Sequence, residues 1–356
     1  MQTDALTAKS TPSSATGQTA CTRRGLLKLA GAAAASLTVG HGVRLARAAD
    51  PVSKGKTAPP LPRGRELGFY VAPRDPKLAE KLAWLREQGV RHIGLDGMGG
   101  PPKAEELDRI GRIIEQAGMQ AVALHGVGAM AHPENDQKPL RTAHLNDLER
   151  AAAWKCQHLV IHFRLLAIPW RDGVGFEEAG IITKIGLEVY DGRVAELLAW
   201  LCEEAAKRSV RIALENLPIQ HQFSYRVEEI VAMIKRLKLP NLGVCLDSGH
   251  VHCSGQDVAT AIRAAGSHLM TTHLHDNLGG GDPRLPIPKT DLHLAVGLGT
   301  IHWPATIRAL DESGYRGPAV IEGARIGPKE TAEQDWQRGV SMCIANWRAM
   351  EALAKE

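Results

Sequence analysis

Cysteine is scarce in this chain, and its few cysteines follow no pattern. The 356 residues include six cysteines, and no two of them form a C-x-x-C pair. Five of the six come after residue 48, an odd number that does not suit a disulfide framework. The sequence therefore excludes a disulfide-stapled scaffold and predicts free, buried thiols.

A confident membrane span is also lacking, because the apolar stretch near the N-terminus is too short for one. This stretch follows the adjacent Arg23 and Arg24 and leads to the small-residue pattern ARA at 46–48. A charged segment, a short apolar segment and an A-x-A pattern are typical of a secretory signal, and the arginine pair resembles a twin-arginine motif. We expect residues 1–48 to be an export signal read by the twin-arginine machinery and then removed, which places the protein in the periplasm. Residues 49–65, rich in proline and lysine, read as a linker.

An excess of basic charge is lacking once this signal is set aside. The whole chain has 43 Lys and Arg against 39 Asp and Glu, and residues 1–48 hold six of the bases and one of the acids. The remainder is close to neutral. No basic footprint for nucleic acid is left, so a DNA-binding partner is not expected.

From residue 66 on, short apolar runs alternate with segments of helical periodicity. The runs begin at Leu67, His92, Gln120, His158, Arg211, Leu242, His268 and Pro318. Eight strands interleaved with helices predict parallel βα units, and eight is the number that closes a barrel. We expect an α/β fold, a single-domain (β/α)8 TIM barrel over residues 66–352 behind the export signal. An open doubly wound sheet is the alternative.

Residues able to do chemistry gather where these strands end, and the active sites of such barrels lie at that face. They are His125, His162, Glu215 with Asn216, Asp247 with His250, His273 with His275 and Asp276, and Glu322. His92 and His158 stand at strand starts, so we expect them to be structural.

Period-two alternation predicts which neighbours share a face with these residues. It places Glu215 with Ala213, Asp247 with Cys245, and His125 with Ala121 and Ala123. The polar residues at the strand ends then share faces with small residues, which suits a crowded barrel interior. The branched residues are expected to face the helices.

Four strand ends supply a metal-ligand set, formed by Glu215, Asp247, His273 and Glu322. Three carboxylates and one imidazole suit manganese or magnesium, with cobalt or zinc as substitutes. Without a cation the convergent acids would repel one another and some would be protonated. The set predicts a divalent-metal site, with Mn²⁺ as the expected ion.

Five segments, ALENLP, GVCLDSGH, HLHDN, DLHLAVGLGTIHW and AVIEG, follow one another along the chain. In composition and order they resemble the xylose-isomerase-like barrel superfamily. That superfamily contains sugar isomerases and epimerases, inosose dehydratase and the endonuclease IV family of DNA repair enzymes. The similarity spans nearly all of the chain beyond the signal.

The resemblance implies a role for each matching residue. In the sugar-converting members, the residues matching Glu215, Asp247, His273 and Glu322 hold one divalent ion. The endonuclease IV branch adds further ligands, for which this chain offers His125, His162, His250, Asp291 and His293. A long insertion between Asp276 and Asp291 leaves open whether Asp291 and His293 bind a second metal or the substrate. His275 is expected to contact substrate or water.

The predicted activity is that of a metal-dependent sugar isomerase or epimerase. A chelated hydroxy-ketone or hydroxy-aldehyde has a more acidic C–H, and the metal stabilises the enediolate that forms. We expect Glu215 and Glu322 to flank the substrate as an acid/base pair besides binding metal. Loss of a β-substituent would instead give a dehydratase or lyase acting on a keto-sugar, keto-glycoside or inosose. A phosphodiesterase resembling endonuclease IV is the other alternative.

Export favours free or oxidised sugars over sugar phosphates as substrates. Residues 164–190 are long for a βα loop and are expected either to cap the pocket or to bury their own aromatics. Trp303 and Phe223 follow strand ends and either stack on a sugar or pack against helices. The expected partners are the carbohydrate and the export machinery, and an oligomer is left open.

Overall fold

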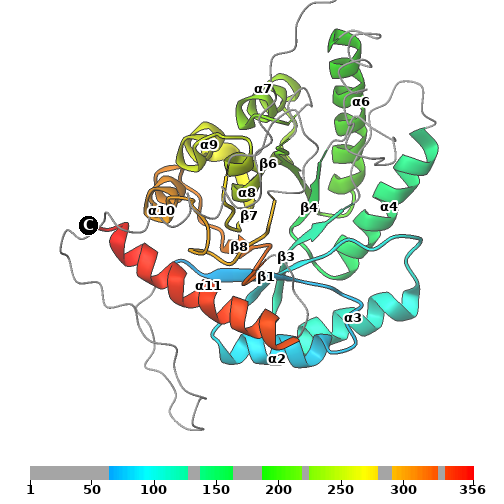
Figure 1. Cartoon of the computed structure of the whole chain (residues 1–356). Coiled ribbons are helices and arrows are strands. Elements are labelled where there is room, and N and C mark those ends of the chain that lie inside the picture. Colours follow the sequence, from blue (N-terminus) through cyan, green and yellow to red (C-terminus); the bar gives the residue numbers. More distant parts are fainter. Residues whose placement is uncertain (1–63, 127–136, 163–186, 219–223, 280–290, 328–332) are drawn as a thin grey trace, which may run out of the picture. The chain divides into compact units, whose positions relative to one another are not determined.

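The computed structural model describes residues 64–126, 137–162, 187–218, 224–279, 291–327 and 333–356. Residues 61–356 form one compact unit, in which strands and helices alternate (Figure 1). The expected export signal, Phe223 and residues 164–186 of the long loop lie outside the described residues.

Eight parallel strands form one sheet in sequence order, with β1 paired to both β2 and β8. The strands are β1 (Leu67–Val71), β2 (His92–Leu95), β3 (Gln120–His125), β4 (His158–Ile161), β5 (Arg211–Glu215), β6 (Leu242–Asp247), β7 (Leu269–His273) and β8 (Ala319–Ile321). Leu274 closes the ring between β7 and β8, since its N–H donates to Val320 O (2.9 Å) and its carbonyl accepts from Glu322 N (3.1 Å). The TIM barrel is confirmed, and the doubly wound alternative is wrong.

Helices surround the strands and present apolar stripes to them. They are α2 (Leu78–Glu87), α3 (Ala104–Gln116), α4 (Gln137–Ala153), α6 (Leu187–Ala206), α7 (Val227–Leu237), α8 (Ser248–Cys253), α9 (Val258–Ala265), the 3-10 turn η1 (Gly266–His268), α10 (Trp303–Glu312) and α11 (Glu333–Leu353). In α7, for example, Val227, Ile230, Val231 and Ile234 are buried, the i, i+3, i+4, i+7 pattern of an amphipathic helix. None of the described helices is both long enough and apolar enough to cross a membrane.

The barrel wall separates two apolar regions. Branched residues such as Ile212 and Val244 belong to the large core beneath the helices. Ala123, Val160, Ala213 and Cys245 form a small cluster of their own. The predicted division between branched and small faces is therefore confirmed for β5 and β6, whose small faces carry Glu215 and Asp247.

Strand β3 departs from strict alternation. Ala121 packs in the outer core, although Ala123 belongs to the small cluster. The register with β2 shifts beside Ile93, so that Val122 is an extra residue, as in a β-bulge. The prediction that Ala121 shares a face with His125 is wrong, because a bulge reverses the alternation at that point.

Two lesser predictions hold. The five cysteines of the described part of the chain are free and buried. His92 Nε2 lies 2.7 Å from Glu66 Oε2, and His158 Nδ1 lies 3.2 Å from Val122 O, both at strand starts. These histidines stabilise the face opposite the strand ends.

Candidate metal centre and active site

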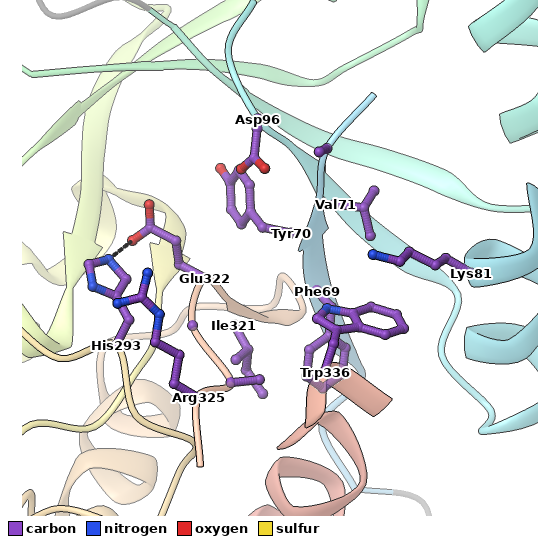
Figure 2. A pocket seen from close by; sticks show the side chains of 13 residues that line it. Phe69, Tyr70, Val71, Lys81, Asp96, His293, Ile321, Glu322, Arg325 and Trp336 are labelled. Atoms are coloured by element: carbon purple, nitrogen blue, oxygen red, sulfur yellow. Dashed lines mark ion pairs between the residues drawn. The ribbon is translucent and has the colours of Figure 1, made fainter. Parts of the chain in front are cut away.

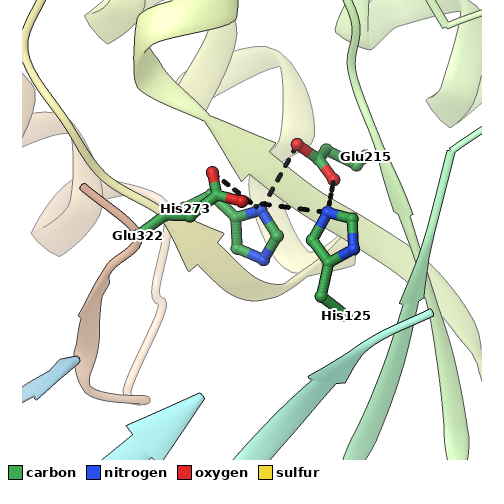
Figure 3. A group of neighbouring side chains, drawn as sticks. All are labelled: His125, Glu215, His273 and Glu322. Atoms are coloured by element: carbon green, nitrogen blue, oxygen red, sulfur yellow. Dashed lines mark ion pairs between the residues drawn. The ribbon is translucent and has the colours of Figure 1, made fainter. Parts of the chain in front are cut away.

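The ends of β3, β5 and β7 and the residue after β8 bring four side chains together (Figure 3). His273 Nδ1 lies 3.3 Å from Glu215 Oε1 and 3.4 Å from Glu322 Oε2. His125 Nε2 lies 3.4 Å from Glu215 Oε2 and 3.8 Å from Glu322 Oε1. We call these four residues the axial group; their ligand atoms all lie within 4.8 Å of one another.

Asp247 stands beside the axial group and belongs to a second cluster with His250 and His275. Its Oδ2 lies 3.0 Å from His275 Nε2, and its Oδ1 accepts the His250 N–H at 2.6 Å as the N-cap of α8. His250 Nδ1 lies 3.3 Å from Glu215 Oε1, so His250 connects the two clusters. The predicted four-ligand set is thus divided between neighbouring clusters.

A third cluster joins His275 with Asp291 and His293. The two imidazole rings stack in parallel with centroids 4.1 Å apart. Asp291 Oδ1 lies 3.4 Å from His293 Nδ1, and Asp291 Oδ2 lies 3.3 Å from His250 Nε2. Despite the insertion that precedes them, Asp291 and His293 therefore reach the site.

His162 lies just past β4, with its ring centroid 5.4 Å from that of His125. Among the described residues, it belongs to none of the three clusters. All ten predicted site residues thus lie at one end of the barrel.

Asn216 explains why an asparagine follows Glu215. Its amide donates to Asp247 O (3.0 Å), and its side-chain oxygen accepts from Asp247 N (2.9 Å). This pair of bonds fixes the end of β5 to the end of β6. The relative positions of Glu215 and Asp247 are thereby fixed.

Tyr70 is a site residue that the sequence pattern did not predict. It is buried in β1, and its Oη lies 2.7 Å from His273 Nε2. A Cβ on Gly94 would lie within 2.6 Å of the Tyr70 ring, so that glycine makes room for it. The sequence held one clue to Tyr70. Within the apolar run of β1, Gly68 and Tyr70 lie two residues apart and therefore share a face, here the inner one.

Asp276, which the sequence already places at the end of strand seven with His273 and His275, holds the loop that carries the third cluster. Its buried carboxylate accepts from the backbone N–H groups of Asn277 (2.9 Å), Gly297 (2.9 Å) and Ile301 (3.2 Å). It also accepts from Trp303 Nε1 at 2.7 Å. Trp303 is 1% exposed, so it packs inside the protein and does not face a sugar.

The charges of the clusters stabilise one another. Burial by itself would raise the pKa of Glu215, but the neighbouring imidazoles of His273, His125 and His250 outweigh burial and hold that pKa well below its ordinary value. Burial likewise opposes ionisation of Glu322, and His273 and His293 lower its pKa. In return the carboxylates raise the pKa values of His125 and His293 to about 9 in spite of burial. Carboxylates and imidazolium groups therefore compensate each other at neutral pH.

Several buried polar atoms of the clusters still lack a hydrogen-bond partner among the described residues. They are Glu215 Oε2, Glu322 Oε2, His273 Nδ1 and His275 Nδ1. Such atoms are costly unless something satisfies them, and here they converge. Carboxylate oxygens with imidazole nitrogens are ligands that suit manganese, cobalt or zinc. The residues present therefore fit a divalent cation.

Solved structures of similar fold support the architecture. A 3-keto-D-glucoside 4-epimerase, YcjR, from E. coli is 17% identical, with a TM-score of 0.60, 82% of this chain and 99% of that chain covered. The IOLI protein, solved with a zinc atom bound, is 19% identical, with a TM-score of 0.61, 80% of this chain and 99% of that chain covered. At these identities the likeness concerns the fold.

Sequence relatives point to the same family. An uncharacterised protein, y4fM, of Sinorhizobium fredii is 23% identical over 70% of this chain and 81% of its own length. A probable endonuclease 4 of Chloroflexus aggregans is 28% identical over 44% of this chain and 51% of its own length. The family model of the xylose isomerase-like TIM barrel matches residues 82–345, most of the compact unit. The chain belongs to the xylose isomerase-like TIM barrel family.

Proposed function

We propose that this protein is a divalent-metal-dependent sugar epimerase or isomerase acting on a free or oxidised sugar through an enediolate. One observation carries the proposal. Glu215 and Glu322, from β5 and from the end of β8, both lie within 3.4 Å of His273 Nδ1, and each keeps a buried oxygen without a hydrogen-bond partner among the described residues. The epimerase of similar fold is consistent with the proposal.

The proposed ligands are Glu215, Asp247, His273 and Glu322, with Mn²⁺ as the proposed ion. A bound divalent ion polarises a substrate carbonyl and stabilises the negative charge that develops when the neighbouring C–H loses its proton. His125 also lies within the axial group, so it is a further candidate for a ligand or a substrate contact.

The two glutamates differ in solvent exposure, and this difference gives them different proposed roles. The Glu215 side chain is 1% exposed, and the Glu322 side chain is 16% exposed. Glu322 therefore meets the substrate first. Because its pKa is held low, it is ionised and able to accept the α-proton. His293, 3.7 Å from Glu322, and His125 stand on either side as proton donors to substrate oxygens.

The test is exchange of the substrate α-proton in heavy water. Manganese-loaded protein is incubated with free sugars, inososes and 3-keto-glycosides, and proton NMR follows one α-proton signal. Native protein should exchange it, and the product will separate epimerase, isomerase and the lyase alternative. Glu322→Gln should abolish exchange, whereas Glu351→Gln, a buried glutamate on α11, should retain it. Exchange by Glu322→Gln with metal still bound would refute the assignment.

A second candidate function, phosphodiester hydrolysis, has one observation in its favour. His250, Asp291 and His293 stand together, Asp291 lying within 3.4 Å of both histidines, and such a cluster suits an additional metal. Bis(p-nitrophenyl) phosphate is the probe for this activity. Its hydrolysis by protein that holds three metal ions, with no sugar exchanged, would replace the sugar proposal.

We further propose that the protein is exported through the twin-arginine route and acts in the periplasm. Support comes from the order of features in residues 1–48, in which Arg23 and Arg24 precede the apolar segment. Replacing both arginines by lysine should leave the protein in the cytoplasm of an export-competent bacterium, whereas Lys9→Gln should not. Equal periplasmic fractions for the two variants would contradict this route.

A further inference from the structure

A cavity of about 290 Å³ opens beside Glu322 (Figure 2). Its walls come from the ends of β1 and β8 and from side chains of α2 and α11. Glu322 and His293 line it on one side, so the cavity is continuous with the proposed reaction site. Lys81, Asp96, Arg325 and Trp336 also line it, and the proposed proton transfer uses none of these four.

Arg325 is placed by the same backbone that places Glu322 and His293. Its N–H donates to His293 O at 3.0 Å, and its carbonyl accepts from Ala295 N at 2.8 Å. Figure 2 shows its guanidinium next to Glu322 and His293, with Lys81 and Trp336 on the other side of the cavity. A group that extends from a substrate held at Glu322 would therefore meet Arg325 first.

The charges of the lining favour a neutral occupant. Lys81 already pairs with Asp75 at 2.7 Å and lies over the Trp336 ring, 4.7 Å from its centroid. Beyond the reaction site itself, the lining then adds the cation of Arg325 and the carboxylate of Asp96. One cation and one carboxylate offer hydrogen bonds of both kinds without a net charge, which suits hydroxyl groups better than an anion.

The size and the aromatic wall favour a ring. Trp336 is half-buried and packs on Trp84, with ring centroids 5.5 Å apart, so its ring has a fixed neighbour behind it. Ligand pockets run from roughly 300 to 1,000 Å³. At about 290 Å³ this cavity suits one ring of a larger substrate.

We propose that the cavity, here called the Trp336 subsite, binds the second sugar ring of a neutral glycoside whose reacting ring lies at Glu322. Among the free and oxidised sugars of the proposed function, the preferred substrate is then a two-ring glycoside and not a monosaccharide, and Arg325, Asp96 and Trp336 determine that preference. This inference rests on the proposed sugar chemistry at Glu322 and names its substrate class.

Binding tests the subsite without requiring turnover. Calorimetry on the manganese-loaded full chain compares cellobiose with glucose, two probes that differ by one ring. Native protein should bind cellobiose at least about tenfold more tightly than glucose. Arg325→Gln and Trp336→Leu should remove that preference while glucose binding stays within about threefold. Arg308→Gln on α10 and Trp200→Leu on α6 are matched controls that should keep it.

The possible outcomes distinguish a failure of the proposed subsite from a failure of the proposed reaction. The proposal of a sugar-binding subsite would be refuted by equal binding of the two probes or by no binding of cellobiose. It would also be refuted if both subsite variants kept the preference for cellobiose. Tighter binding of glucuronate than of cellobiose would assign the cavity to an acid and overturn it as well. Trp336→Leu removes a ring that packs on Trp84 and can therefore disturb folding. Arg325 is exposed, so Arg325→Gln still tests the subsite if Trp336→Leu misfolds. Failure of every sugar to exchange its α-proton would instead refute the proposed function.

Discussion

At the scale of single residues, Tyr70 decides which nitrogen of His273 faces the carboxylates. Its Oη lies 2.7 Å from Nε2, which leaves Nδ1 directed at Glu215 and Glu322. A ligating imidazole nitrogen carries no proton, so the proton must sit on Nε2 and be donated to Tyr70. Tyr70→Phe removes this acceptor, and we expect Mn²⁺ affinity to fall about 10- to 100-fold. Competition with a chelator of known affinity measures the change.

The matched control is Tyr315→Phe. Tyr315 is as buried as Tyr70, each 6% exposed, but its Oη donates to Pro318 O at the start of β8. That variant should keep the native metal affinity. Equal affinities for Tyr70→Phe and native protein would show that Tyr70 does not orient His273.

At the scale of elements, Asp276 holds the segment between β7 and α10. Three backbone N–H groups and the Trp303 indole donate to its buried carboxylate. Each buried donor left without an acceptor costs about 1–3 kcal/mol, so Asp276→Ala should lower the free energy of unfolding by about 3 kcal/mol or more. Trp303→Phe removes one of these bonds and should cost about 1 kcal/mol through it. Urea unfolding of the two variants checks the order, and equal losses would contradict this role of Asp276.

The same elements show what the sequence can predict and what it cannot. The ends of β5, β6 and β7 were predictable because parallel strands place all their C-terminal ends at one face, and Glu215, Asp247 and His273 stand at those ends. The assignment of Asp247 to a neighbouring cluster was not predictable, because alternation defines a face and not the partner that a side chain reaches. The bulge at Val122 depends on the register of β2, which β3 does not encode.

The cavity beside Glu322 was also not predictable from the sequence. It requires Trp336 of α11 to stand near Lys81 of α2, and these helices lie far apart in the chain. Helix packing around the barrel brings them together. Motifs at strand ends contain no information about that packing.

At the scale of the whole molecule, stability should depend on pH through histidines remote from the site. His144 of α4 is fully buried, and neither ring nitrogen has a hydrogen-bond partner among the described residues. Burial disfavours its charged form and lowers its pKa from the ordinary 6.5 to about 4. The unfolded chain therefore binds more protons than the folded protein between pH 6.5 and 4, and the free energy of unfolding falls as the pH drops through that window.

At pH 5 the folded protein has lost about 2 kcal/mol of stability through His144, since a tenfold difference in proton affinity between the folded and unfolded states corresponds to about 1.4 kcal/mol. His144→Leu abolishes this contribution, so the variant should lose correspondingly less stability than native protein between pH 7 and pH 5. Denaturant unfolding at the two pH values measures the difference, with His268→Leu, a half-buried histidine before β7, as the control. If His144→Leu and native protein lost stability equally, folding would leave the pKa of His144 unchanged and this account of His144 would be wrong.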